Sequence, residues 1–203
     1  MQIQIKKLGK RFDSGWIIRD LDLHIETGQK YAVTGPNGSG KSTLISMIAG
    51  YLSQTKGSIT YKLEGKSIDR DNIYSYLALS TAYSELDEEL NAIELFRHFS
   101  VFKPMLISNV TEFLELAELS KHSKKQVKYY SSGMKQRLNL ALTMTMDTPL
   151  LILDEPTSFL DEDRKNWYQS MVKQFAKGRT VVVASNLESD FSFCDKQIIL
   201  KTL

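Results

Sequence analysis

A glycine-rich stretch, residues 32–44, contains a spacing that can bind phosphate. Gly35, Gly40, Lys41 and Ser42 fit the pattern G-x-x-x-x-G-K-[ST]. A loop that wraps a polyphosphate must point successive backbone N–H groups inward, which requires dihedral angles that glycine adopts at low cost. Lys41 can place a cation against the terminal phosphates, and Ser42 offers a hydroxyl to Mg²⁺. The pattern predicts a phosphate-binding loop (P-loop) for a nucleoside triphosphate, formed by Gly35, Pro36, Asn37, Gly38, Ser39, Gly40, Lys41, Ser42 and Thr43.

The sequence around this loop fits that function. Residues 30–34 (Lys-Tyr-Ala-Val-Thr) indicate a short buried strand, and residues 41–49 indicate an apolar helix closed by Gly50. The N-terminal end of that helix would point its dipole at a bound anion. The alternative is a glycine-rich turn that binds nothing, and the strand–loop–helix setting argues against it.

A second group of polar residues follows an apolar run. Residues 150–153 are Leu-Leu-Ile-Leu, typical of a buried strand, and Asp154 and Glu155 come directly after them. Asp154 at a strand end beside a P-loop can hold Mg²⁺. Glu155 is then placed to orient and polarise an attacking water. The alternative is that the two carboxylates cap the helix that follows.

The composition limits the class of protein. The chain has 203 residues and a formal net charge of +2, which fits one domain and supports neither a nucleic-acid binder nor an acidic tail. The one cysteine, Cys194, excludes an internal disulfide and a cysteine-cluster metal site, and we expect it to be a small buried hydrophobe. No apolar run reaches the roughly 18 residues that a membrane helix needs. Residues 1–7 alternate and lack the apolar region of a signal peptide. We expect a soluble, cytoplasmic α/β protein.

Strand and helix patterns alternate along the chain. Beyond those already named, the expected strands are 2–6, 16–25, 58–63 with a hairpin turn at 64–66, 72–80, 180–184 and 198–200. The expected helices are 88–102, 108–119, 132–146 and 161–175. Lysines concentrate in residues 120–128, where a solvated loop is favoured over a basic patch for lipid or nucleic acid. The order predicts a mostly parallel sheet interrupted by an all-helical insert.

A third motif makes the whole resemble the ATP-binding subunits of ABC transporters. Tyr130-Ser-Ser-Gly-Met-Lys-Gln-Arg137 resembles the family's signature motif, usually Leu-Ser-Gly-Gly-Gln, and lies between the P-loop and the Asp154–Glu155 pair, as that family requires. Alone, it indicates only a serine cap before an amphipathic helix. Residues 158–161 (Ser-Phe-Leu-Asp) resemble the family's D-loop. The resemblance covers residues 1–203 and implies one α/β domain of the P-loop NTPase, ABC ATPase type. Its parts would be a mostly parallel sheet core with an antiparallel β patch, residues 1–82 and 147–203, and a helical subdomain, residues 83–146.

The resemblance also implies cofactors and partners. The cofactors would be ATP and Mg²⁺, with Lys41 and Glu155 catalytic and with Ser42 and Asp154 at the metal. Ser131 and Gly133 of a second ATPase subunit, in a homodimer or heterodimer, would cover the γ-phosphate in a head-to-tail sandwich of two ATP molecules. Phe12 matches the family's adenine-stacking aromatic, with Trp16 as the other candidate. An integral membrane permease would be the other partner, holding the chain at the cytoplasmic face of the membrane, and no nucleic acid is expected.

The sequence departs from the family pattern in three places. The family's glutamine after the 72–80 strand is absent, and the nearest equivalents are Ser80 and Thr81. Asn186 stands where a histidine is expected, so that position can donate a hydrogen bond but cannot carry charge or relay a proton. It would be a weakened catalytic residue, or else it caps a short helix from Leu187. The signature motif has Ser132 and Met134 in place of glycine and glutamine.

These departures leave three functions to compare. The first is the ATP-hydrolysing subunit of an ABC transporter, which would contact a permease through apolar candidates in the helical subdomain. Those candidates are Phe96, Phe99, Phe102 and Met105, for most of which core packing is the expected role. The second is a soluble ABC ATPase acting on ribosomes or DNA, which usually has two cassettes or a coiled-coil insert. The third is an ATP-binding module with little hydrolysis in an asymmetric pair.

Overall fold

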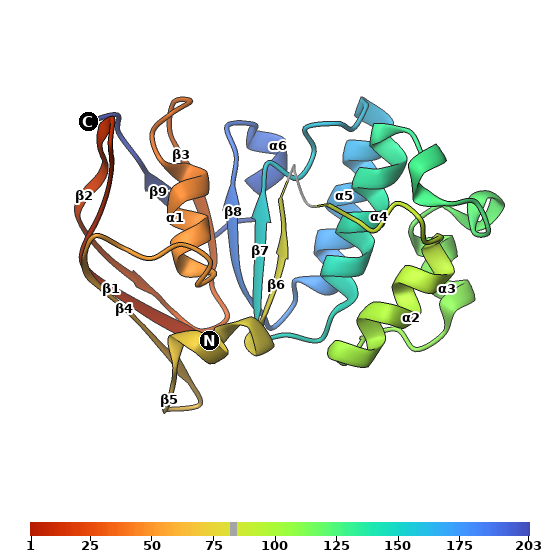
Figure 1. The fold of residues 1–203 in the computed structure, drawn as a ribbon, viewed down its shortest axis with the longest axis horizontal. Helices are drawn as coiled ribbons and strands as arrows, with labels where there is room; N and C mark the ends of the chain where they lie inside the picture. The colour runs from red at the N-terminus through yellow and green to blue at the C-terminus, as the bar shows by residue number, and fades with distance from the viewer. Residues whose placement is uncertain (82–84) are drawn as a thin grey trace.

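The strands form two sheets, one parallel and one antiparallel. The computed structural model describes residues 1–81 and 85–203; the predicted boundary between core and helical subdomain, at residues 82 and 83, lies outside them. Among the described residues a five-stranded sheet has the order β6-β7-β8-β3-β9 and a four-stranded sheet has the order β2-β1-β4-β5 (Figure 1). The first is parallel and comprises β6 (Leu77–Ser80), β7 (Leu150–Asp154), β8 (Thr180–Ala184), β3 (Lys30–Thr34) and β9 (Lys196–Ile199). The second is antiparallel and comprises β1 (Gln2–Phe12), β2 (Gly15–Ile25), β4 (Lys56–Leu63) and β5 (Lys66–Ile68).

The central parallel strands are mostly apolar because both of their faces are covered. All five residues of β7 and of β8 are buried. Val33 of β3 pairs with Ala184 of β8, and Ala184 pairs with Asp154 of β7. The carboxyl ends of these three strands therefore meet at one edge, the upper edge in Figure 1. Ligands of open parallel sheets bind at that edge.

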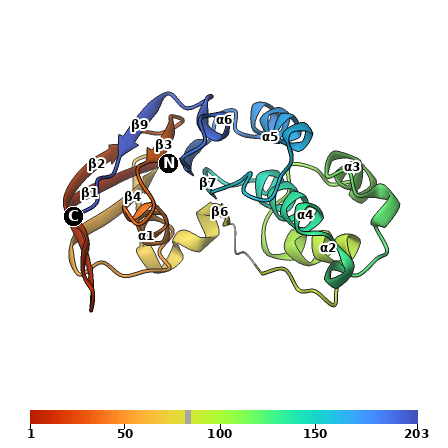
Figure 2. The same cartoon turned by 90° about the horizontal axis from the view of Figure 1, so that it is seen from above.

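The alternating side chains of the parallel strands show which helices cover each face of the sheet. Ile152 and Val182 belong to a buried cluster with the apolar residues of α1 (Lys41–Ile48). Their neighbours Leu151 and Val181 belong to a second cluster with residues of α4 (Ser132–Thr145) and α5 (Glu162–Phe175). Because neighbouring side chains of a strand point to opposite faces, α1 lies on one side of the parallel sheet and α5 on the other (Figure 2).

The antiparallel sheet is longer than the sequence predicted. The expected strand 2–6 continues to Phe12, and register shifts interrupt its pairing between Ile5 and Leu8. Lys7 has a φ of 47° there, and its amide donates to Asp22 Oδ1 at 2.8 Å. This irregularity carries the strand past two exposed lysines, where strict alternation of buried and exposed residues breaks down.

The predicted strand 72–80 is wrong over most of its length. Residues Arg70–Tyr76 form a 3₁₀ helix, η1, and only Leu77–Ser80 join the sheet as β6. Arg70 holds η1 against the loop that follows α1, because its guanidinium donates to the carbonyls of Leu52 at 2.6 Å and Gly50 at 3.3 Å. Of the η1 residues only Ile73 is buried, so no strand face forms there.

The region between β6 and β7 is helical, as predicted, with shorter helices. It contains α2 (Ala92–Phe102), α3 (Val110–Leu116), α4 and two short 3₁₀ turns, η2 (Ser120–His122) and η3 (Val127–Tyr129). The expected helix 88–102 begins at Ala92 because Asn91 and Glu94 form a reciprocal capping box. The expected helix 108–119 begins at Val110, capped by Asn109. A last short helix, α6 (Glu188–Phe191), follows β8. Over the described ranges, no helix has the length and apolarity to cross a bilayer.

Candidate nucleotide site

The P-loop joins β3 to α1 and depends on glycine at two positions. Gly35 has a φ of 144°, and a Cβ there would lie 2.3 Å from the Leu200 carbonyl oxygen. Gly40 has a φ of 95°, and a Cβ there would lie 2.8 Å from a side-chain carbon of Ile17. Any larger residue at either position would be strained and would collide with its neighbours. The loop therefore keeps its backbone close to the sheet edge.

Several hydrogen-bond donors of the loop have no side-chain partner and could bind an anion. Gly40 is the N-cap of α1 and supplies no side-chain hydrogen bond, so side chains do not satisfy the first N–H groups of this helix. Lys41 is almost buried, and its Nζ donates to the Gly35 carbonyl oxygen at 2.9 Å. The hydroxyl of Ser39 is buried without a hydrogen-bond partner. A phosphate at this helix terminus would supply the partners that these groups lack.

A cavity of about 480 Å³ opens onto this loop. Phe12 at the end of β1 and Ile17 on β2 form its apolar part, and Glu155 lines it as well. The P-loop lining is Asn37, Gly38, Gly40, Lys41, Ser42 and Thr43. Trp16, the other candidate for adenine stacking, points elsewhere, because its ring packs over Gly9 and lies 5.4 Å from Lys56 Nζ. Phe12 is therefore the aromatic at the cavity. No motif in the sequence pointed to Ile17.

Asp154 and Glu155 reach the same edge from β7. Asp154 is the last residue of the strand, and its Oδ1 is buried without a hydrogen-bond partner. Burial raises the pKa of Asp154, while a hydrogen bond with Ser42 and the charge of Lys41 act in the opposite direction. A buried carboxylate oxygen with an unused lone pair beside a hydroxyl is the donor set of a hard cation. Asp154 and Ser42 thus fit the predicted metal site.

Glu155 adopts a strained backbone conformation that orients its carboxylate. Its φ is 48°, and its amide donates to the Ala184 carbonyl at 2.8 Å, which fixes the turn after β7 to the end of β8. Such strain in a non-glycine residue is typical of functional sites. Burial raises the pKa of Glu155, while the charge of Lys41 and a hydrogen bond from Ser185 lower it. The alternative role, capping the next helix, is wrong because Asp161 caps α5 through the amide of Arg164 at 3.1 Å.

Asn186 contacts the P-loop and does not cap a helix. Its Nδ2 lies 3.1 Å from Asn37 Oδ1. With the amide in its other orientation, the side-chain oxygen lies 3.2 Å from Lys41 Nζ. Helix α6 begins at Glu188 with Leu187 as a cap that supplies no side-chain hydrogen bond. The predicted helix-capping alternative is therefore wrong, and the structure places Asn186 beside the P-loop.

The substitutes proposed for the missing glutamine do not line the cavity. Ser80 is fully buried at the end of β6, and its hydroxyl accepts a hydrogen bond from Asn139 Nδ2 of α4 at 2.9 Å. Asn139 also donates to the Thr81 carbonyl at 3.4 Å. Neither residue is among those lining the P-loop cavity. This junction ties β6 to α4, a link that the sequence analysis missed.

The signature residues Ser131 and Gly133 lie outside that cavity too. Ser131 is exposed and caps α4, its Oγ accepting from the Met134 amide at 3.3 Å. A Cβ on Gly133 would lie 3.4 Å from the Phe159 carbonyl oxygen, so this glycine is not required by local packing. Neither Ser131 nor Gly133 lines the P-loop cavity, which leaves a second helix N-terminus facing solvent.

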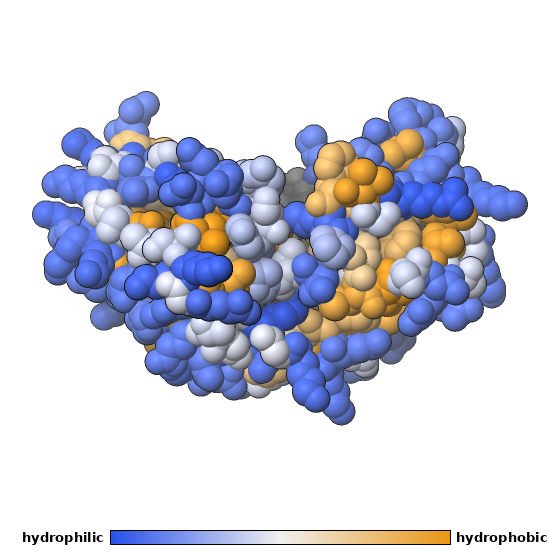
Figure 3. Space-filling model, turned by 90° about the horizontal axis from the view of Figure 1, so that it is seen from below, coloured by the Kyte–Doolittle hydropathy of each residue, from blue (hydrophilic) through white to orange (hydrophobic). Residues whose placement is uncertain are grey.

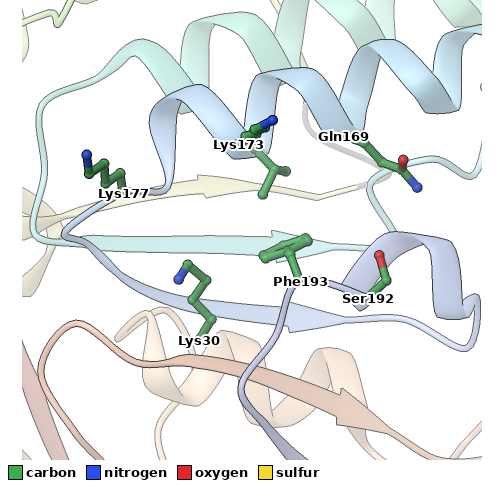
Figure 4. A pocket seen from close by; sticks show the side chains of 7 residues that line it. Lys30, Gln169, Lys173, Lys177, Ser192 and Phe193 are labelled. Carbon is green, nitrogen blue, oxygen red and sulfur yellow. The ribbon is translucent and has the colours of Figure 1, made fainter.

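Another cavity of about 480 Å³ shares no lining residue with the P-loop site. Figure 4 shows Phe193 at its centre, with Lys30 and Lys177 on one side and Gln169 and Ser192 on the other. Local structure accounts for two of its three lysines: Lys30 lies 4.0 Å from Asp195, and Lys173 lies in the last turn of α5, where cations stabilise the helix dipole. Among the described residues that line it there is no carboxylate, so this cavity lacks the chemistry of the P-loop site.

Comparisons with known proteins agree with this geometry. A family model described as ABC transporter matches residues 18–158. The lantibiotic transport ATP-binding protein SrtF of Streptococcus pyogenes is 30% identical over 189 residues, covering 93% of this chain and 81% of that protein. The uncharacterized ABC transporter ATP-binding protein YxlF of Bacillus subtilis (strain 168) is 32% identical over 202 residues, covering 98% of this chain and 68% of that protein.

Solved structures show the same fold. The dimeric structure of MJ0796, a bacterial ABC transporter cassette, has a TM-score of 0.84 and 23% identity, covering 98% of this chain and 94% of that chain. A structure described as the ATP binding subunit of an ABC transporter has a TM-score of 0.84 and 23% identity, covering 100% of this chain and 88% of that one. The predicted fold class is confirmed. The chain belongs to the ABC transporter family, as an ATP-binding subunit and an ATPase.

Proposed function

We propose that this chain binds MgATP at the P-loop cavity, hydrolyses it in a head-to-tail dimer and drives a separate membrane permease. The observation that carries the proposal is the convergence of Lys41, Ser42 and Glu155 on one cavity that also contains Phe12. One bound nucleotide would then contact the phosphate-binding groups, the general base and the aromatic ring that stacks on adenine. Phosphate release from ATP by the purified chain, with and without Mg²⁺, tests the proposal.

The residues divide the work by position. Lys41 and the open N–H groups of α1 hold the phosphates, and the phenyl ring of Phe12 stacks on the base. Glu155 orients a water and accepts its proton, and Asn186 donates a hydrogen bond beside Lys41. Ser42 and Asp154 would hold Mg²⁺, which neutralises phosphate charge when it is bound.

A second subunit is proposed because one chain leaves the nucleotide half covered. The P-loop cavity contains no residue of the signature motif, while the N-terminus of α4 at Ser131 and Gly133 faces solvent. Two copies in head-to-tail arrangement would place the α4 terminus of each against the nucleotide of the other. The closed two-fold dimer so formed gives two equivalent sites.

An apolar surface on the helical half of the molecule, the region between β6 and β7, offers a contact for the permease. Figure 3 shows apolar side chains gathered on the underside of that half. At the end of α2 and just after it, Val101 is 80% exposed, Phe102 69% and Leu106 47%. Of the other predicted contact residues, Phe96 is buried and Phe99 and Met105 are half-buried, so they serve packing. A cluster of exposed large side chains is typical of a protein-binding surface.

Polar substitution of this surface should separate transport coupling from ATP hydrolysis. We expect the double variant Val101→Ser, Phe102→Ser to lose co-purification with an integral membrane protein from detergent-solubilised membranes, while its basal ATPase rate stays unchanged. Tyr51→Ser is the control, since Tyr51 is 71% exposed on the other half of the molecule. Equal retention of the membrane protein by the double variant and the control would exclude this surface.

Replacing Asn186 by histidine should speed hydrolysis. Asn186 supplies a hydrogen-bond donor without charge, and losing one preorganised donor costs about 100- to 1000-fold in rate. Since the donor is here only weakened, we expect Asn186→His to raise the maximal rate by about tenfold, with little change in ATP affinity. Maximal rate and melting temperature are measured together. A rate that is flat or lower in the folded variant would show that position 186 does not limit hydrolysis.

A further inference from the structure

A buried carboxylate lies behind the Glu155 turn and has no place in the function described so far. Asp190, on α6, has no exposed surface. Its Oδ1 accepts from the Thr157 hydroxyl at 2.6 Å, and its Oδ2 accepts from the Ser185 hydroxyl at 2.7 Å. Its backbone carbonyl accepts from the hydroxyl of Tyr168, a fully buried residue of α5, at 2.9 Å. The turn after β7 and the end of β8 therefore hold the carboxylate, and α5 holds the backbone of the same residue.

These hydrogen bonds join the two loops that carry the proposed catalytic side chains. Thr157 belongs to the turn after β7, two residues beyond Glu155, and Ser185 directly precedes Asn186 after β8. Asp190 accepts one hydroxyl from each loop, both of them buried. Hydrogen bonds to a charged acceptor are worth roughly twice those between neutral groups. Asp190 thereby fixes the spacing of the two loops.

The direction of the Ser185 proton also matters. A serine hydroxyl has one proton, and its Oγ lies 2.7 Å from Asp190 Oδ2 but 3.3 Å from Glu155 Oε2. The same Oγ accepts from the Leu187 amide at 3.1 Å. The shorter contact indicates that the Ser185 hydroxyl donates mainly to the Asp190 carboxylate. The Glu155 carboxylate keeps only the longer contact with the Ser185 hydroxyl, so it stays available to a water.

We propose that Asp190 is a positioning residue for ATP hydrolysis. By accepting from the hydroxyls of Thr157 and Ser185, it holds the loop that carries Glu155 against the loop after β8, and so sets where the Glu155 carboxylate lies. This inference rests on the proposed role of Glu155 as the group that activates water. Asp190 does not line the nucleotide cavity, so it acts on the rate of the chemical step and not on nucleotide binding.

Replacing one of the two carboxylate oxygens of Asp190 tests the proposal. Asp190→Asn keeps the shape of the side chain but has one acceptor oxygen where the carboxylate has two. We expect kcat to fall about 10- to 100-fold, the size of effect produced by small misplacements of catalytic groups. The KM for ATP and the ATP dissociation constant should not change. Asp195→Asn is the control, because Asp195 lies near the same segment, is paired with Lys30, and does not contact Glu155 or Ser185.

A second pair of variants keeps the test decisive if Asp190→Asn does not fold. Thr157→Val removes the hydroxyl at nearly constant shape and should lower kcat, while Thr157→Ser retains the hydroxyl and should keep it. Ser185→Ala should lower kcat as well, and combining it with Thr157→Val should cost less than the product of the single losses, because both act through one carboxylate. A purely structural role would lower the melting temperature and leave kcat per folded protein unchanged.

The outcomes separate this inference from the function on which it rests. If the Thr157, Ser185 and Asp190 variants hydrolyse ATP at the wild-type rate while Glu155→Gln is inactive, the positioning role is wrong and the role of Glu155 stands. If Glu155→Gln hydrolyses ATP at the wild-type rate, the proposed function fails at its base, and the role of Asp190 fails with it. A lowered kcat with unchanged KM in the hydroxyl-removing variants, restored by Thr157→Ser, supports the proposal.

Discussion

A Lys41→Ala variant will bind ATP about 10- to 100-fold more weakly than the wild-type chain, because charged hydrogen bonds are worth about 1.5–3 kcal/mol. Lys41 Nζ is almost buried at the cavity and donates to the Gly35 carbonyl, so the ammonium is already held beside the position of the phosphates. Alanine leaves the triphosphate without this cation. The ATP dissociation constant is measured by equilibrium titration in the presence of Mg²⁺.

The control for Lys41→Ala separates local from global effects. Lys62→Ala removes an exposed lysine of β4 that does not line the P-loop cavity, and this variant should bind ATP like the wild type. The melting temperature of both variants checks that they fold. An unchanged ATP affinity in folded Lys41→Ala would contradict the assignment of the P-loop.

Glu155→Gln will stop hydrolysis and keep ATP binding. General-base catalysis contributes about 100- to 10,000-fold, and an amide cannot accept the proton of the water. The amide keeps the shape of the side chain, so the turn after β7 and its hydrogen bond to the end of β8 should persist. Since ATP remains uncleaved, we expect this variant to accumulate as a dimer with ATP and Mg²⁺, observed by light scattering after size-exclusion chromatography.

An exposed glutamate provides the matched control for this variant. Glu112→Gln makes the same chemical change on α3, away from the cavity, and should hydrolyse ATP normally. Phosphate release is measured for both at saturating ATP. A Glu155→Gln variant that turns over ATP at the wild-type rate would remove Glu155 from the mechanism.

Local features of this chain could be predicted from its sequence. The P-loop follows from glycines that no other residue can replace, as Gly35 and Gly40 show, together with the adjoining strand and helix. Strand β8 coincides with its predicted position because polar residues bound its apolar run, and α4 begins where predicted because Ser131 caps it. In such segments the local pattern and the tertiary environment favour the same structure.

Features that depend on distant contacts could not be predicted. The strand expected at 72–80 is mostly η1, because Arg70 bonds to carbonyls after α1 that the local pattern does not reveal. Asn186 lies against Asn37, 149 positions away in the chain, and it was predicted at this site from the family resemblance and not from its local pattern. No local pattern distinguishes Asp190, and only the fold brings it to Ser185 and Thr157. A single sequence gives the periodicity of an element but not the partners that it meets.

The shared active site is the central claim of this account, and mixing two inactive variants tests it most directly. Lys41→Ala disables the P-loop, and Gly133→Asp places a negative charge at the start of α4, where a Cβ makes only an ordinary contact. Each variant alone should be inactive. In a head-to-tail dimer the mixed pair has one intact site, so an equimolar mixture should recover about a quarter of the wild-type ATPase rate if subunits pair at random. A mixture that stays as inactive as its components would contradict a site built from two subunits.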